Sequence, residues 1–222
     1  MNQRTRIKIC GLTREADVDA AVAAGADAIG LNFYPKSPRF IALARAVELA
    51  RRLPPFVTPV GLFVNADDAE IAAACVAIPT LVLQFHGDET PEQCRRAGRP
   101  YLRAARITPQ LDLLDFASRY SDAQAVLLDA HVEGYGGGGK VFDWSLVQSL
   151  LAAVPLPVVL SGGLHAGNVI HGIHTLRPWA VDVSSGVESA ELPKRGIKDA
   201  DSIRRFCDAV READARADAS IA

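Results

Sequence analysis

Charge of one sign is what this sequence most clearly lacks. Its 222 residues carry 24 Lys and Arg against 26 Asp and Glu, a net charge of −2, and no run of five or six like charges occurs. Binding to nucleic acid or to an anionic membrane surface depends on a basic patch, which this balance does not provide. We therefore expect no nucleic acid and no membrane among the partners.

Long hydrophobic runs and paired cysteines are missing too. The apolar stretches are shorter than the ~18 residues that span a bilayer, and no apolar core of a signal peptide follows the basic N-terminus, so we expect a cytoplasmic protein. The cysteines at 10, 75, 94 and 207 form no CxxC pair, which disfavours a zinc site or a disulfide framework. The histidines show no HExxH spacing, and no metal site is predicted.

Short β-rich runs alternate with Ala- and Leu-rich or amphipathic segments. Eight such runs begin at Arg6, Ala28, Thr58, Leu81, Tyr101, Ala125, Pro157 and Ala180. Their starts lie 20 to 32 residues apart, which indicates a repeat of one strand and one helix. The pattern predicts an α/β protein, a single (β/α)8 TIM barrel over residues 1–222, with the Ala- and Asp-rich end frayed from about Arg211.

Glycine-rich cofactor fingerprints are absent from the turns. The turn after the first run reads CGLT rather than GxGxxG, so no dinucleotide site is indicated. Residues 133–140 read EGYGGGGK, but Val141 follows Lys140 and no crossover helix begins there, so the P-loop pattern fails. We interpret this run as a loop able to fold over a ligand, with a plain surface loop as the alternative.

Polar residues gather at the carboxyl ends of the predicted strands, where the active site of such a barrel is built. They include Cys10, Asn32, Asn65, Gln84, His86, Arg106, Asp129, Ser161 and Ser184. Alternation along a strand directs Lys8 and Cys10 toward the barrel axis and places Gln84 and His86 on one face. We expect these side chains to converge on a substrate, with Gln84 and His86 contacting it.

Two small-residue turns predict a phosphate site. Ser161-Gly162-Gly163 and Ser184-Ser185-Gly186 follow the seventh and eighth strands, where this fold usually holds a phosphate. Their glycines let backbone N–H groups approach an anion, and their hydroxyls donate hydrogen bonds. The alternative is that the glycines only form tight turns. We expect a small phosphorylated ligand bound by Gly162, Gly163, Ser184, Ser185 and Gly186.

A thiol and a carboxyl group at facing strand ends carry the most chemical meaning. Cys10 and Asp129 could act as opposed general base and general acid if their environments shift their pKa values in opposite directions. The pKa of Cys10 would have to fall, with Lys8 assisting. Arg39 lies on a proline-restricted loop and could bind a carboxylate through two hydrogen bonds. The alternatives are a core cysteine, a helix cap and a solvated arginine.

Several motifs occur in the order found in one enzyme family. They are KICGLT, SPRF, LQFHGDE, LLDA, FDW, SGGL with NV, and VDVSSGVE followed by GIKD. From about Lys8 to Ile203 the chain resembles the phosphoribosylanthranilate isomerases of tryptophan biosynthesis. The resemblance implies an Amadori rearrangement of N-(5-phosphoribosyl)anthranilate in a (β/α)8 barrel, with no metal or organic cofactor. It further implies that Cys10 is the general base, that Asp129 is the general acid and that Arg39 binds the anthranilate carboxylate.

Two other functions stay open at this point. The analogous isomerase of histidine biosynthesis is expected to use two carboxylates, and Cys10 argues against it. A phosphate-binding protein that has lost catalysis is the second alternative, and the complete set of polar residues at the strand ends argues against that. The Ala-rich helix faces do not distinguish a monomer from a homodimer, because they suit internal packing and subunit contact alike.

Overall fold

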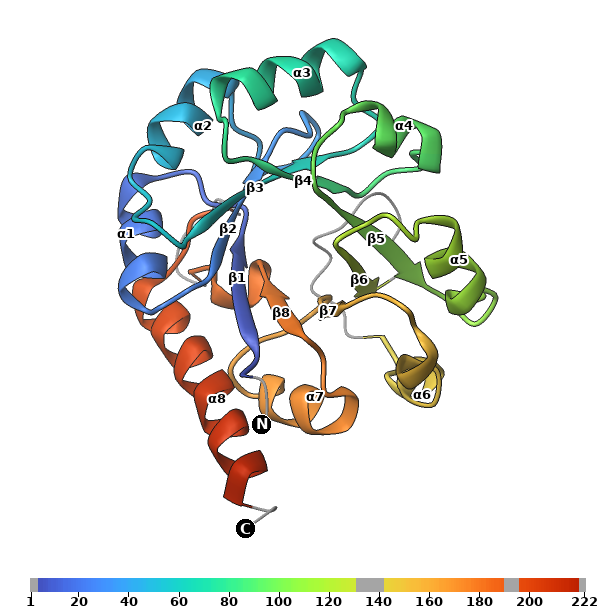
Figure 1. Cartoon of the computed structure of the whole chain (residues 1–222). Coiled ribbons are helices and arrows are strands. Elements are labelled where there is room, and N and C mark those ends of the chain that lie inside the picture. The colour runs from blue at the N-terminus through green and yellow to red at the C-terminus, as the bar shows by residue number, and fades with distance from the viewer. Residues whose placement is uncertain (1–3, 131–141, 190–195, 220–222) are drawn as a thin grey trace.

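The chain forms a closed eight-stranded barrel surrounded by helices. A computed structural model describes residues 4–130, 142–189 and 196–219. The EGYGGGGK run at residues 133–140 therefore lies outside the described residues. Eight strands follow one another around the barrel in chain order, and every neighbouring pair is parallel (Figure 1). The predicted TIM barrel is confirmed.

The strands match the predicted runs closely. They are β1 (Arg6–Cys10), β2 (Ala28–Asn32), β3 (Thr58–Phe63), β4 (Val82–Phe85), β5 (Tyr101–Ile107), β6 (Ala125–Ala130), β7 (Val158–Leu160) and β8 (Ala180–Val183). The seam between the first and last strands is closed by the pairing of β1 with β8, in which Lys8 is aligned with Asp182. This register sets two charged residues side by side.

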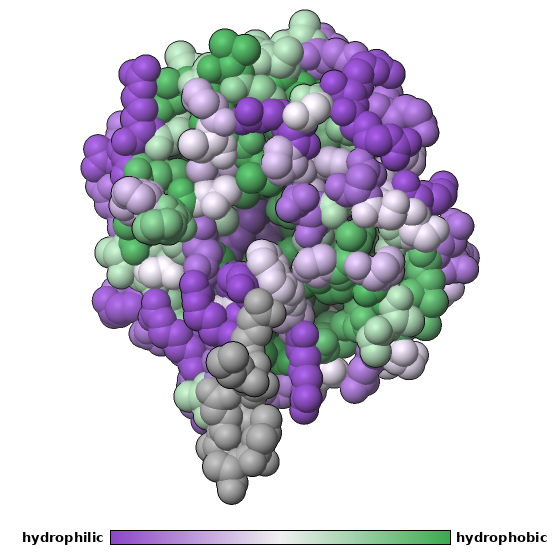
Figure 2. Space-filling model, viewed as in Figure 1, coloured by the Kyte–Doolittle hydropathy of each residue, from purple (hydrophilic) through white to green (hydrophobic). Residues whose placement is uncertain are grey.

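Helices connect successive strands around the outside of the barrel. They are α1 (Glu15–Ala23), α2 (Leu43–Ala50), α3 (Asp68–Ala77), α4 (Pro91–Arg96), α5 (Leu113–Arg119), α6 (Ser145–Gln148), α7 (Val169–Leu176) and α8 (Ala200–Ala219), with short 3-10 helices η1 (Leu151–Ala153) and η2 (Ser185–Val187). Side-chain caps begin several of them; Thr90 and Gln93 form a capping box at α4, which satisfies N–H groups that the helix leaves unpaired. Hydrophilic residues cover much of the helical rim (Figure 2).

The barrel has two apolar layers because successive side chains of a strand point to opposite faces. Ile7 and Ile9 belong to the large core cluster between the strands and the helices. Leu127 and Val159 belong to a smaller cluster of alternate strand residues, which faces the barrel interior. Lys8 lies between Ile7 and Ile9 and therefore also faces the interior, as predicted.

The C-terminal helix is longer than the sequence predicts. We expect fraying from about Arg211, but α8 continues to Ala219 and packs against α1 and α7. Ala213 is fully buried, and Asp214 accepts hydrogen bonds from the backbone N (2.9 Å) and hydroxyl (2.7 Å) of Thr5. Composition alone does not reveal these hydrogen bonds, because Thr5 and Asp214 are 209 residues apart in the chain.

Candidate active site

The carboxyl ends of β1 and β8 hold a buried group of charged and thiol side chains. Cys10 is the last residue of β1, and Lys8, two residues earlier, donates a hydrogen bond of 2.8 Å to Asp182 on β8. Lys8 and Asp182 are each 5% exposed. An ion pair removed this far from water must be well matched, since each charge alone would be costly to bury.

The thiol of Cys10 differs from the prediction in the direction of its pKa. Burial raises the pKa of Cys10 above its ordinary value, and Asp182 raises it further, although Lys8 and Lys198 oppose the shift. The two lysines are present, but desolvation of the thiolate outweighs them. Gly30 gives the sulfur its space, because a Cβ there would lie 2.6 Å from the Cys10 Sγ.

Asp129 is linked to a chain of hydrogen bonds from β4. His86 lies with its Nε2 3.0 Å from the Asp129 Oδ2, and the Gln84 amide nitrogen lies 3.0 Å from the His86 Nδ1. With Gln84 donating to Nδ1, the imidazole carries its proton on Nε2 and donates it to Asp129. Gln84 is fully buried. Gln84 therefore orients His86, which in turn orients Asp129, and a contact between Gln84 and the substrate stays a prediction.

The two buried groups lie close enough to influence each other electrostatically. Burial raises the pKa of Asp182, and the Asp129 carboxylate raises it further. Lys8 and His86 act in the opposite direction and lower it. Asp182 therefore lies within electrostatic reach of the Lys8 and Cys10 group on one side and the Asp129 and His86 group on the other. That these side chains converge on a substrate stays a prediction.

Arg39 is not the solvated arginine that was the alternative to a carboxylate-binding residue. Its side chain is 7% exposed and forms an ion pair with Glu188. The Arg39 Nε donates to Glu188 Oε1 (2.5 Å) and its Nη2 donates to Oε2 (3.0 Å). One bidentate edge of the guanidinium is therefore already occupied by a carboxylate of the protein itself.

The two small-residue turns have structural reasons for their glycines. Gly162 and Gly163 have φ values of 82° and 65°, a region that favours glycine. A Cβ on Gly186 would lie 1.9 Å from the Leu164 carbonyl oxygen, so close packing of the two turns requires that glycine. Ser185 and Gly186 lie in η2, and the Ser184 hydroxyl donates to the Cys10 carbonyl oxygen (3.1 Å). The second turn is thus tied to the end of β1.

Some polar residues at the strand ends support loops instead of joining the site. Buried Glu89 accepts hydrogen bonds from the backbone N–H groups of Asn65 (2.7 Å) and Gly87 (2.9 Å), and buried Arg103 donates to the carbonyl oxygens of Phe85 (2.9 Å) and Gly87 (3.1 Å). These bonds fix the segment that carries His86. Arg103 stands inside a predicted strand, and a charged residue is almost never buried without a partner, so its position was a sequence signal for these contacts.

Two polar residues near the site, Glu188 and Lys198, were missed as functional candidates, whereas strand alternation had already placed Asp182 on one face with Ser184. Glu188 and Lys198 carry the contacts to Arg39 and to the second turn, and Asp182 holds Lys8. Glu188 and Lys198 stand in the motifs SSGVE and GIKD, but nothing in the spacing of those motifs shows that the two side chains meet.

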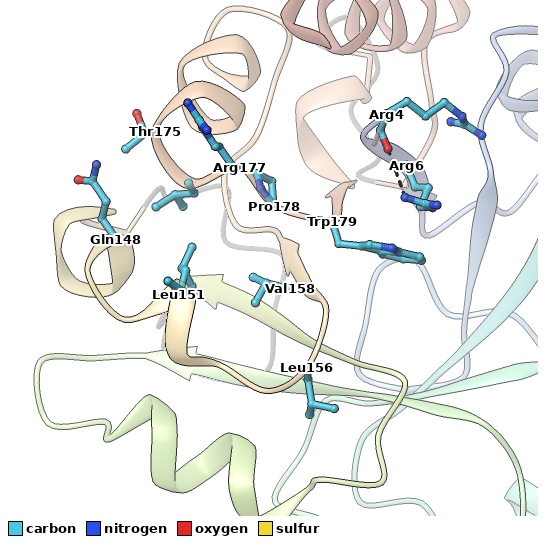
Figure 3. Close-up of a pocket in the computed structure, with 12 residues that line it drawn as sticks. Arg4, Arg6, Gln148, Leu151, Leu156, Val158, Thr175, Arg177, Pro178 and Trp179 are labelled. Carbon is cyan, nitrogen blue, oxygen red and sulfur yellow. Dashed lines mark hydrogen bonds between the residues drawn. The ribbon is translucent and has the colours of Figure 1, made fainter. Parts of the chain in front are cut away.

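A cavity of about 630 Å³ lies at the other end of the barrel. Arg6 begins β1, and Trp179 and Leu156 come just before strands, so this cavity lies at the amino ends of the strands (Figure 3). The Arg6 guanidinium stacks over the Trp179 ring at 4.4 Å from its centroid. In this fold the amino-terminal face serves stability and the carboxyl-terminal face carries chemistry, so we place the candidate site with Cys10 and Asp129.

Within residues 4–130, 142–189 and 196–219, no three His, Cys, Asp or Glu side chains are grouped as metal ligands. In the same part of the chain, no helix is long and apolar enough to cross a bilayer.

Together, the barrel and this site define a class: (β/α)8-barrel proteins with an acid, a thiol and small-residue turns at the carboxyl ends of the strands. The family model of N-(5'phosphoribosyl)anthranilate (PRA) isomerase matches residues 7–209. The chain belongs to that family.

Individual relatives agree with the family model. The N-(5'-phosphoribosyl)anthranilate isomerase of Methylibium petroleiphilum is 73% identical over 217 residues, covering 98% of this chain and 99% of the relative. The phosphoribosyl anthranilate isomerase structure from Thermotoga maritima is 39% identical with a TM-score of 0.84, covering 94% of this chain and 99% of that one. A second isomerase structure, in complex with reduced 1-(o-carboxyphenylamino)-1-deoxyribulose 5-phosphate, is 37% identical with a TM-score of 0.81 and the same coverage.

Proposed function

We propose that this protein is an intramolecular aldose–ketose isomerase of tryptophan biosynthesis. It converts N-(5-phosphoribosyl)anthranilate to 1-(2-carboxyphenylamino)-1-deoxyribulose 5-phosphate by an Amadori rearrangement. The observation that carries this proposal is the Lys8–Asp182 ion pair, which influences Cys10 on one side and feels the charge of Asp129 on the other, in a chain of this family. A relative was crystallised with a reduced form of the product, which supports a phosphorylated substrate of this kind.

Proton transfers alone complete this reaction. Asp129, as general acid, protonates the ribose ring oxygen, and the furanose opens to an iminium ion. The thiolate of Cys10, as general base, removes the proton from C2, and the resulting enolamine tautomerises to the ketone. The substrate loses no electrons in this sequence, so the proposal invokes no metal or organic cofactor.

The two ends of the substrate have separate binding groups in this proposal. The phosphate is held by Gly162, Gly163, Ser184, Ser185 and Gly186. The anthranilate carboxylate is bound by Arg39, whose guanidinium suits a planar carboxylate. His86 holds Asp129 at a distance of 3.0 Å and faces the substrate beside it. These assignments rest on the positions of the residues at the strand ends and on the motif resemblance.

Turnover of two substrates tests the function. Purified protein should isomerise N-(5-phosphoribosyl)anthranilate and restore growth of a tryptophan auxotroph that lacks this isomerase. The aminoaldose of histidine biosynthesis should be turned over much more slowly. Activity on that aminoaldose alone would assign the protein to the histidine-pathway enzyme, and soluble folded protein with neither activity would favour a binding protein.

The phosphate site predicts a selective effect at Gly163. The Gly163→Ala variant should have a raised KM and weakened inhibition by inorganic phosphate, because a methyl group would stand between the turn and the anion. A valine would add strain at φ 65°, so alanine is the cleaner replacement. The measurement is the inhibition constant for phosphate, together with the free energy of unfolding.

Gly98→Ala is the matched control for that variant. Gly98 has a φ of 60° and no atom within 4 Å of the Cβ position, so alanine there imposes a similar backbone strain without touching a ligand. Both variants should lose a similar free energy of unfolding, about 1 kcal/mol, and only Gly163→Ala should weaken phosphate inhibition. Equal phosphate inhibition in both would move the phosphate site away from this turn.

Oligomeric state and cellular location enter this proposal as predictions. We expect a monomer or a homodimer in the cytoplasm, with the phosphorylated substrate as its partner and with neither nucleic acid nor membrane bound. The balanced charge of the whole sequence supports the last two expectations.

A further inference from the structure

Three buried charged side chains connect the proposed carboxylate-binding residue to the proposed phosphate-binding turn. Arg39, Glu188 and Lys198 have side-chain exposures of 7%, 9% and 0%. Glu188 accepts two hydrogen bonds from Arg39 and one of 3.0 Å from the Lys198 ammonium. Burial of three ionisable groups in one place is costly unless they are paired. The ion pairs among these three side chains therefore hold each of them in a fixed position.

The lysine connects this group to the second small-residue turn. Lys198 also donates to the Ser184 carbonyl oxygen (2.9 Å) and contacts the Ser184 hydroxyl (3.3 Å). That hydroxyl in turn donates to the Cys10 carbonyl oxygen. Burial lowers the pKa of Lys198, although the Glu188 charge opposes the shift. The group therefore joins Arg39 to the turn proposed to hold phosphate and to the end of β1.

The guanidinium of Arg39 has two edges that can each hold a carboxylate. Glu188 occupies the edge formed by Nε and Nη2, which leaves Nη1 and the second N–H of Nη2 to form the other. The aliphatic part of Arg39 is fixed as well, because a Cβ on Gly11 would lie 2.5 Å from the Arg39 Cδ. With its stem and one edge held, the plane of the guanidinium is fixed before any ligand binds.

We propose that Glu188 is a positioning residue, which orients the second edge of the Arg39 guanidinium toward the aromatic carboxylate of the substrate. Lys198, bonded to both Glu188 and Ser184, fixes this orientation relative to the phosphate-binding turn. The inference rests on the proposed function. In this arrangement the Arg39–Glu188–Lys198 group sets the distance between the carboxylate site and the phosphate site. Substrate selection for a carboxylate on the ring then depends on Glu188, which itself does not touch the substrate.

The test compares two substrates in the full-length protein. One is N-(5-phosphoribosyl)anthranilate and the other is N-(5-phosphoribosyl)aniline, which lacks the ring carboxylate. Glu188→Gln keeps the size of the side chain but replaces one acceptor oxygen by an NH2 group that cannot accept from Arg39 or Lys198. The ratio of kcat/KM for the two substrates should fall about tenfold or more, mostly through KM for the anthranilate substrate.

Double substitution and a control sharpen this result. Arg39→Lys should lower the same ratio, and Glu188→Gln added to Arg39→Lys should lower it little further, since both act on one contact. Glu48→Gln, which changes an exposed glutamate paired with Arg45, should leave the ratio unchanged. If Glu188→Gln fails to fold, Glu188→Asp keeps the charge but shortens the reach, and it should lower the ratio as well.

The outcomes separate this inference from the function on which it rests. Equal loss on both substrates in a folded Glu188 variant would reduce Glu188 to a structural ion pair and overturn the inference. Wild-type protein that discriminates poorly between the two substrates would overturn it by removing the role of Arg39, with the isomerase function intact. Wild-type protein without activity on either substrate would overturn the proposed function itself.

Discussion

Asp129→Asn should lower kcat by about 10² to 10⁴, the usual effect of removing a positioned general acid. This corresponds to about 3 to 5 kcal/mol of transition-state stabilisation, at ~1.4 kcal/mol per decade. Asparagine keeps the shape of the side chain and an oxygen that can accept from His86, so the variant should stay folded and still bind a product analogue. Single-turnover rates and binding of reduced product measure the two effects separately.

Asp115→Asn provides the control for this experiment. Asp115 lies on α5, and its exposed carboxylate is paired with Arg119, so the same change of charge there should leave kcat unaltered. An Asp129→Asn variant that retained near-normal kcat would remove Asp129 from the acid role. A variant that lost product binding to the same extent as kcat would instead place Asp129 among the binding residues.

Cys10→Ser should abolish most of the activity while preserving the fold. A serine hydroxyl nearly matches the thiol in shape but is far too weakly acidic to supply an anion near neutral pH. The expected loss in kcat is again about 10² to 10⁴. Cys94→Ser is the matched control, because Cys94 is a fully buried thiol in α4 that belongs to the core between the strands and the helices. Near-normal turnover by Cys10→Ser would make Cys10 a packing residue.

The same assignment of Cys10 as the base predicts the direction in which the activity of the wild type changes with pH. The base is the thiolate, so kcat/KM should rise with pH as the thiol loses its proton. Burial raises the pKa of Cys10, so the midpoint of this rise should lie above the ordinary thiol value of about 8.5. The rising limb should be missing from the residual activity of Cys10→Ser. A midpoint well below the ordinary value would contradict the raised pKa.

Sequence pattern predicted the barrel well because the barrel depends on local signals. Each strand is a short apolar run followed by a helix, and alternation correctly placed Lys8 on the interior face beside Asp182. The turns after β7 and β8 were located by their glycines, whose positive φ values or close contacts are local requirements.

The features of the site that could not be predicted from the sequence depend on contacts between distant segments. Arg39 and Glu188 are separated by 149 positions, so nothing near Arg39 in the sequence shows that its guanidinium is paired. The direction of the Cys10 pKa depends on how much water the folded site excludes, and a lysine two residues away could not reveal that. Gln84 followed the correct alternation, but that pattern could not show its complete burial or its hydrogen bond to His86.

The hydrogen bonds between Thr5 and Asp214 bear on how the chain folds during its synthesis. The ribosome releases β1 first, yet its partner β8 ends at Val183 and the residue that secures Thr5 comes at position 214. Until nearly the whole chain has emerged, one edge of β1 has no strand to pair with, and an open strand edge can pair with other chains. A nascent protein stalled before β8 should therefore be prone to aggregation.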